Sequence, residues 1–114
     1  MNQYEFVQRI RAINCSIAGK EGNLGKRFSA VSPSIVSLED GVLHPSMQEK
    51  LDNIKKILTN DSVSEISPEE LKKVVQRLSK STMKKIIKQL YDIEHCLEDE
   101  LINANFKHSS YNHD

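Results

Sequence analysis

Residues 67–106 read SPEELKKVVQRLSKSTMKKIIKQLYDIEHCLEDELINANF, and no other stretch of the chain is as long or as regular. Ser67 can cap a helix, Pro68 suits its first turn, and Glu70 completes a capping box. Apolar residues then recur at spacings of three and four, which predicts one face of a helix. The residues on this face are Leu71, Val75, Leu78, Thr82, Ile86, Leu90, Ile93 and Leu97. The stretch therefore predicts a long amphipathic C-terminal helix over about residues 68–105.

The middle of this helix leaves two alternatives open. Residues 79–82 (Ser-Lys-Ser-Thr) are poor helix formers as a group, so the helix is either continuous or interrupted by a kink or turn near 79–82. Even a helix limited to residues 82–105 would be about 36 Å long at 1.5 Å per residue. A domain of 100 residues has a radius of gyration near 13 Å. We therefore expect the end of the helix to project past its own bundle.

Helical patterns also flank the centre of the chain. Residues 2–18 carry apolar residues at helical spacing, with Asn2 and Glu5 placed as a capping box and Gly19 suited to a left-handed helix end. Residues 46–59 form a second such pattern, for which Ser46 and Glu49 give the capping box. Both segments are predicted to be helices.

The two intervening segments are harder to assign. Residues 19–28 hold three of the four glycines but lack the Walker spacing, which favours a flexible connector or partner-contacting loop over a phosphate-binding loop. Residues 29–45 fit either a short helix that starts at Ser32-Pro33 or a hairpin around Asp40-Gly41. The short helix is favoured because an isolated hairpin is only marginally stable in water.

Together these patterns predict a small all-α bundle of four or five helices. A chain of 114 residues fits one domain, which we place at residues 1–106, followed by a polar, disordered tail at residues 107–114. No apolar run approaches the length of a membrane span. Cys15 and Cys96 are far apart and form no metal-binding pattern, which favours reduced thiols in a cytoplasmic protein.

The charges of the long helix are the feature that most needs an explanation. Sixteen basic and sixteen acidic residues cancel, which argues against a protein that coats nucleic acid by bulk charge. On a continuous helix, however, five cations would form one cationic stripe opposite the apolar face. They are Lys73, Arg77, Lys80, Lys84 and Lys88. Beyond residue 90 the sign reverses, with Asp92, Glu94, Glu98, Asp99 and Glu100.

Two interpretations of this stripe remain open. It is either a solvated face whose repulsion is screened by salt, or a surface that meets something negative. The negative counterpart would be a partner protein, nucleic acid, or the acidic end of a second copy packed antiparallel. The last possibility follows from the reversal of sign along the helix, and it predicts a homodimer.

Residues 67–91 also permit an interpretation as a DNA-binding unit. The run from Leu78 to Leu90 places small polar residues ahead of cations and an apolar face, and it resembles the recognition helix of helix-turn-helix regulators. The contacts that this resemblance implies are Lys80, Ser81, Lys84 and Lys85. The run departs from the motif in two ways: its turn contains no glycine, and Lys73 stands where the preceding helix usually needs a small residue.

No catalytic or metal-binding pattern accompanies these features. His95 lies within a helical turn of Asp92 and Asp99, but a metal site in a bundle needs ligands from several helices. No serine or cysteine is placed with a histidine in a nucleophilic pattern. The sequence therefore predicts a protein without cofactor, metal or enzymatic activity. The leading hypothesis is a small cytoplasmic protein-interaction module, acting as a regulator, inhibitor or adaptor, with the DNA-binding regulator as its competitor.

Overall fold

The computed structural model describes the backbone of residues 1–19, 22–60 and 66–111, and the side chains in these ranges as far as Ala104. Its helices are α1 (Gln3–Ala18), α2 (Leu24–Val36), α3 (Pro45–Thr59), α4 (Pro68–Arg77) and α5 (Lys80–Tyr111). The described residues contain no strand, so the all-α fold class and the number of helices predicted from the sequence are confirmed.

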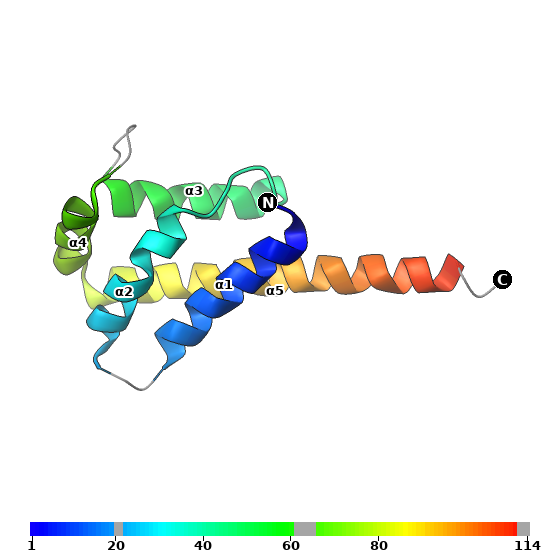
Figure 1. Ribbon diagram of the computed structural model, residues 1–114, viewed down its shortest axis with the longest axis horizontal. Coiled ribbons are helices and arrows are strands. Elements are labelled where there is room, and N and C mark those ends of the chain that lie inside the picture. Colours follow the sequence, from blue (N-terminus) through cyan, green and yellow to red (C-terminus); the bar gives the residue numbers. More distant parts are fainter. Residues whose placement is uncertain (20–21, 61–65, 112–114) are drawn as a thin grey trace.

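Helix α5 is the longest element and the others are arranged around its first half. Figure 1 shows α3 running beside α5, while α1 and α2 cross this pair and α4 sits at the end where α5 begins. Helix α5 packs against α1 and α3, whereas α4 packs mainly against α2 and α3. The predicted long C-terminal helix therefore corresponds to α5, which packs along α1 and α3, and α4 is a separate element.

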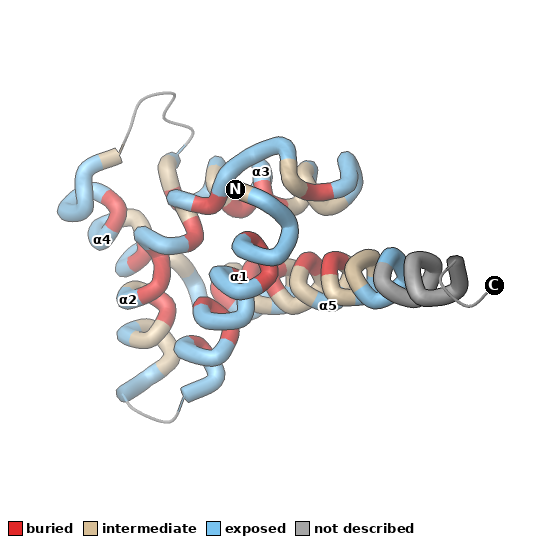
Figure 2. Tube along the Cα trace, turned by 45° about the vertical axis from the view of Figure 1, so that its right-hand side comes forward, coloured by how far each residue is buried: buried red, intermediate tan, exposed pale blue. Residues whose placement is uncertain are grey.

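The core is built almost entirely from aliphatic side chains. Figure 2 shows the buried positions gathered on the inward faces of all five helices. The residues from α5 in this core are Met83, Ile86, Leu90, Ile93 and Leu97. Two phenylalanines, Phe6 of α1 and Phe28 of α2, are fully buried as well. Because each helix contributes one apolar face, their burial together is what stabilises the bundle.

The predicted long helix is interrupted at Leu78 and Ser79. Leu78 adopts an extended conformation (φ −70°, ψ 135°) and its side chain packs against the core. The Ser79 hydroxyl then accepts a hydrogen bond from the Thr82 N–H at 3.1 Å, as an N-cap residue does. Of the two alternatives for residues 79–82, the turn is the observed one, and a continuous helix over 68–105 is wrong.

The starts of α1 and α4 follow the sequence prediction. The Glu5 N–H donates to the Asn2 side chain at 2.8 Å, and the Glu70 N–H donates to the Ser67 hydroxyl at 3.2 Å. The end of α1 differs from the prediction. Gly19 has φ −60°, which is not the left-handed conformation expected there.

The start of α2 corrects the prediction for residues 19–28. Asn23 caps the helix by accepting a hydrogen bond from the Lys26 N–H at 2.8 Å, so the helix begins at Leu24 instead of Pro33. Residues 24–28 are therefore helix and not a flexible connector, while residues 20 and 21 lie outside the description. The alternative hairpin around Asp40-Gly41 is wrong.

Pro33 lies inside α2, where proline normally breaks a helix. Proline has no N–H to donate to the carbonyl four residues earlier, which here belongs to Ser29. The buried hydroxyl of Ser32 donates to that Ser29 carbonyl at 2.8 Å. This bond satisfies the acceptor that Pro33 leaves without its usual partner, so the helix continues past the position at which the sequence predicts its start.

The start of α3 also differs from the prediction. His44 is the cap, since its ring nitrogen accepts from the Ser46 N–H at 3.4 Å, and Pro45 is the first helical residue. The capping box predicted for Ser46 and Glu49 is therefore wrong. The fixed φ of proline favours Pro45 at the first helical position, which places the cap two residues before Ser46.

The distal end of α5 projects past the bundle, as expected from its length. The helix has 32 residues, and Leu97 is the last fully buried residue among its described side chains. Figure 1 shows the end beyond the other four helices, and Ile102 on it is 63% exposed. The disordered tail expected at residues 107–114 stays a prediction, because side chains beyond Ala104 and all of residues 112–114 lie outside the description.

Candidate interaction surface

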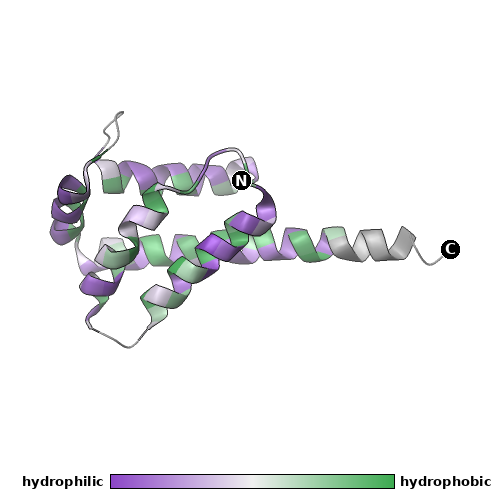
Figure 3. Cartoon of the chain, in the orientation of Figure 1, coloured by the Kyte–Doolittle hydropathy of each residue, from purple (hydrophilic) through white to green (hydrophobic). Residues whose placement is uncertain are grey.

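A cluster of cations surrounds the junction of α4 and α5. Between residues 71 and 91 the chain has seven basic residues and no acidic one. They are Lys72, Lys73, Arg77, Lys80, Lys84, Lys85 and Lys88, here called the basic corner. All seven are exposed, and Figure 3 shows α4 as a mostly hydrophilic helix at this end of the molecule.

No cation of the basic corner forms an ion pair within the described residues, although Glu70 lines the same hollow as Lys73 and Arg77. The ion pairs of the described residues lie elsewhere in the molecule, and they join Met1 to Glu39, Arg11 to Glu98, Lys50 to Asp92 and Lys55 to Asp40. None of them involves a cation of the corner. These seven charges are therefore exposed to solvent without an acidic partner from this part of the chain.

The five cations of the predicted stripe lie on two helices. Lys73 and Arg77 belong to α4, whereas Lys80, Lys84 and Lys88 belong to α5. Figure 1 shows α4 nearly end-on while α5 lies across the view, so the two helices meet at a steep angle. One straight stripe requires a continuous helix and is therefore wrong. The α5 cations still follow one another at spacings of four residues.

The cations of α4 are divided between its two sides. Lys73 and Arg77 line a hollow of about 320 Å³ beside the end of α3. Lys72 lines a different hollow on the side of α2. The basic corner is therefore a charged surface wrapped around α4 and the start of α5, wider than the stripe predicted from the sequence.

The hollow on the side of α2 is the more apolar of the two and is called the α2–α4 groove. It has a volume of about 570 Å³. Its lining consists of the cap residue Asn23, of Gly25, Lys26, Ser29 and Ala30 of α2, of Lys72, Val75 and Gln76 of α4, and of Met83 of α5. Val75 and Met83 are 1% and 7% exposed, while Lys26 and Lys72 are exposed at its rim. No lining residue is acidic.

The groove could not be predicted from sequence because three distant segments form it. Residues 23–28 belong to the segment predicted as a flexible connector or partner-contacting loop, and nothing in the sequence pairs residues 23–30 with α4. The full set of cations in the basic corner could have been found from the sequence. Residues 71–91 contain no acidic residue, and this window includes Lys72 and Lys85 as well as the five cations of the predicted stripe. A search for one helical spacing leaves both of them out.

The acidic half of α5 differs from the basic corner because three of its acids, Asp92, Glu94 and Glu98, have partners. Asp92 pairs with Lys50 of α3 at 3.4 Å. Glu94 accepts from the buried amide of Asn14 at 2.8 Å, and Glu98 accepts from the Arg11 guanidinium at 2.9 Å. Hydrogen bonding with Glu94, and then with Arg11, holds the pKa of Glu98 below its ordinary value. These acids attach α5 to α1 and α3.

His95 and the two cysteines are not arranged for chemistry. The His95 ring stacks on Tyr91 with centroids 6.5 Å apart. Across the described ranges, no three His, Cys, Asp or Glu side chains come together as a metal site would require. Cys15 and Cys96 are free thiols, and burial, with smaller effects of Glu100 and Asp99, raises the pKa of the Cys96 thiol. A raised pKa lowers the thiolate fraction on which thiol reactivity depends.

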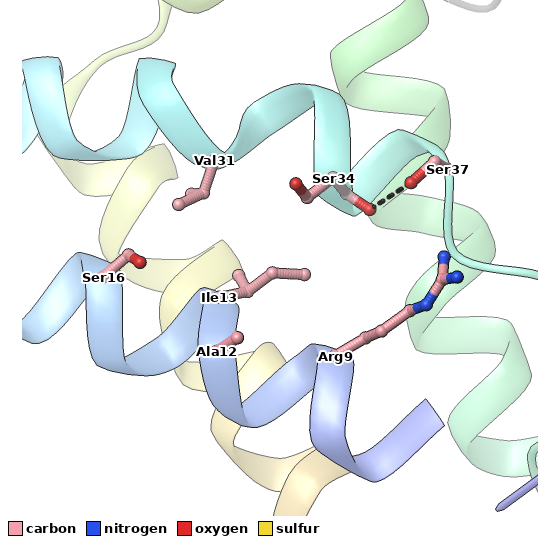
Figure 4. A pocket seen from close by; sticks show the side chains of 7 residues that line it. All are labelled: Arg9, Ala12, Ile13, Ser16, Val31, Ser34 and Ser37. Carbon is pink, nitrogen blue, oxygen red and sulfur yellow. Dashed lines mark hydrogen bonds between the residues drawn. The ribbon is translucent and has the colours of Figure 1, made fainter. Parts of the chain in front are cut away.

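A further hollow lies between α1 and α2. Figure 4 shows small side chains from both helices around it, with Arg9 at one end and the Ser37 hydroxyl donating to the Ser34 carbonyl at 2.9 Å. Its volume is about 310 Å³. The lining contains hydroxyls and one guanidinium but no general base, so it has no groups for acid–base catalysis.

None of the described helices has both the length and the apolar composition needed to cross a membrane. No protein-family model, curated protein or solved structure matches this chain. We therefore infer the function from the geometry and charge of these surfaces.

Proposed function

We propose that the protein is a non-catalytic interaction module of the cytoplasm, whose basic corner binds an acidic surface on a partner protein. The observation that supports this proposal is the density of unpaired charge. Seven exposed cations occupy residues 72–88, and no acidic residue interrupts them. Asp92, Glu94 and Glu98 of the same helix contact α1 and α3, so these three acids are not available to neutralise the corner.

The isolated chain is destabilised by this arrangement. Lys80, Lys84 and Lys88 follow at spacings of four, and each such like-charge pair destabilises a helix by about 0.2–0.5 kcal/mol. An acidic partner would remove this repulsion and replace it with attraction. A concentrated patch of one sign also steers an oppositely charged partner and raises the association rate.

Affinity capture tests this proposal with two double variants. Lys80→Glu with Lys84→Glu reverses two charges of the basic corner. The control, Arg9→Glu with Lys56→Glu, reverses two exposed cations on α1 and α3 that lie outside the corner. Capture from native lysate, followed by mass spectrometry, is expected to retain the same acidic protein with the wild type and the control and to lose it with the corner variant. Equal retention by all three would contradict the proposal.

A DNA-binding regulator is the second candidate, and the turn at Leu78–Ser79 is the observation that favours it. A short turn lets the first residues of α5 be presented as a recognition helix would present them. Lys80, Ser81 and Lys84 are exposed there, and Lys73 is exposed to solvent instead of obstructing the helix pair. Against this function, α4 packs mainly on α2 and α3 and not on α5, with which a helix-turn-helix would pair it.

Duplex DNA binding at two salt concentrations separates the candidates. A protein that neutralises several phosphates loses affinity steeply between about 50 and 200 mM salt because counterions are released. The interaction module is expected to bind duplex DNA weakly and without preference for sequence. Sequence-specific binding that Lys80→Glu with Lys84→Glu abolishes would favour the DNA-binding regulator instead.

A further inference from the structure

The projecting end of α5 carries an exposed apolar side chain next to free acidic charge. Ile102 is 63% exposed, and Leu101 is half-buried. Asp99 lies three residues before Ile102, which places both on the same face of the helix. Within the described residues Asp99 has no ion pair or hydrogen bond, in contrast to Asp92, Glu94 and Glu98. This end thus offers an apolar anchor beside an unpaired carboxylate.

The α2–α4 groove at the opposite end of the molecule has the complementary character. Val75 and Met83 form its apolar floor, and Lys26 and Lys72 stand at its rim. Neither lysine has an acidic partner within the described ranges. A volume of about 570 Å³ lies within the usual range of about 300–1,000 Å³ for binding pockets and accommodates an aliphatic side chain.

We propose that the projecting end of α5 from one copy of the chain binds in the α2–α4 groove of a second copy. Ile102 would contact the floor formed by Val75 and Met83, and Asp99 would pair with Lys72 or Lys26 at the rim. The complementarity of charge argues for a second copy as the occupant, since this chain itself presents both halves of the contact. The inference rests on the proposed interaction function, because it names one partner for the same end of the molecule.

One copy cannot make this contact with itself. Met83 and Ile102 belong to the same helix and are separated by about 28 Å along it at 1.5 Å per residue. Two copies placed antiparallel satisfy both contacts at once, because the groove lies at the start of α5 and Ile102 near its end. Such an arrangement is a closed two-fold dimer, the commonest symmetry of protein oligomers.

Sedimentation of the full chain over a range of concentrations tests the contact. The wild type is expected to convert from one copy to two as its concentration rises. Lys72→Glu and Asp99→Lys are each expected to weaken this association at least tenfold, and Ile102→Asp to remove it. The matched controls are Lys73→Glu, on the other side of α4, and Glu100→Lys, on the other side of α5, and both should dimerise like the wild type.

Mixing the Lys72→Glu and Asp99→Lys variants gives the sharpest result. In a mixed pair, the new carboxylate at position 72 of one copy meets the new ammonium group at position 99 of the other. The second contact of that pair keeps the wild-type residues, so the mixture is expected to dimerise at least tenfold more tightly than either variant alone. A wild type that sediments as a single copy at every concentration would overturn the inference, as would controls that weaken association as much as the two variants do.

Failure of the dimer contact and failure of the proposed function give different experimental results. Lys80→Glu with Lys84→Glu alters neither the groove lining nor Ile102, so this variant is expected to dimerise while it loses the acidic partner. A chain that captures an acidic partner but never dimerises would refute only the contact proposed here.

Discussion

The two halves of α5 use charge in opposite ways. From Lys80 to Lys88 the helix carries exposed cations that contact no acidic group in the described part of the chain. From Asp92 to Glu98 it carries acids that bind Lys50, Asn14 and Arg11 of the neighbouring helices. In the sequence, the side-chain charge changes from positive to negative between the two halves. In the structure these acids bind the neighbouring helices, whereas the cations form no ion pair with the described part of the chain.

The largest expected difference in stability is between substitutions on the buried face of α5 and substitutions on its projecting end. Leu90 is 0% exposed, so Leu90→Ala removes its packing and leaves a cavity, which costs about 2–5 kcal/mol of unfolding free energy. Ile102→Ala is expected to change the stability of the single copy by less than about 0.5 kcal/mol, as substitutions at exposed positions usually do. Urea denaturation at low protein concentration measures both. An equal loss in the two variants would contradict the assigned burial.

The amide of Asn14 is the buried polar link between α1 and the acidic half. It donates to Glu94 at 2.8 Å and to the Leu90 carbonyl at 3.4 Å. Asn14→Ala leaves these acceptors without their donor, which is expected to cost about 1–3 kcal/mol. Combining it with Glu94→Ala in a double-mutant cycle should give non-additive losses, because the two residues contact each other. Additive losses would show that the amide and the carboxylate do not interact.

The turn between α4 and α5 depends on the Ser79 cap. Ser79→Ala removes the acceptor of the Thr82 N–H and is expected to cost about 1 kcal/mol. Ser79→Asp retains an acceptor and serves as the matched control, with stability close to that of the wild type. If alanine and aspartate gave the same unfolding free energy, the cap would contribute nothing.

Reversing one charge in each half compares the halves directly. Lys84→Glu removes two repulsions, with Lys80 and Lys88, and this removal alone should stabilise the chain by about 0.4–1 kcal/mol at low salt. Glu98→Lys instead places a cation beside Arg11 and should destabilise it. Thermal unfolding of the two variants is expected to shift in opposite directions. Shifts of the same sign would mean that the halves do not differ as described.

The smallest effect is the dependence of stability on pH. The pKa of Glu98 is lowered in the folded state from its ordinary value of 4.5, so its carboxylate stabilises the fold above that pH. This contribution is lost as the pH falls below about 4.5 and through the lowered pKa of the folded state. Arg11→Ala removes part of the cause, and its unfolding free energy should therefore fall less steeply with pH in this range than that of the wild type.

Much of the fold follows from local patterns, and what does not follow has identifiable causes. The caps at Asn2 and Ser67 are predictable because each depends only on residues within one helical turn. The sequence wrongly predicts a helix start at Pro33. The Ser29 carbonyl that Pro33 leaves unpaired accepts from the Ser32 hydroxyl, and the general rule that proline breaks a helix does not include this compensation. The turn at Leu78 was left open by the sequence because the apolar spacing continues unchanged across it.

The candidate surface was predicted only in part. The sequence identifies the cations, since a run without acidic residues is visible in it, but not their division between α4 and α5 or between the two sides of α4. The α2–α4 groove brings together residues from positions 23 to 83, and such long-range contacts leave no local pattern. The partners of the acidic half, Arg11, Asn14 and Lys50, are remote in sequence for the same reason.

The central claim is that the basic corner serves binding and not folding. Quantitative capture from lysate measures it most directly, with Lys80→Glu and Lys84→Glu combined, the wild type, and the control with Arg9→Glu and Lys56→Glu. We predict that the corner variant has wild-type helicity and loses an acidic protein that the other two retain. Retention of that protein at the wild-type level by the corner variant would contradict the claim.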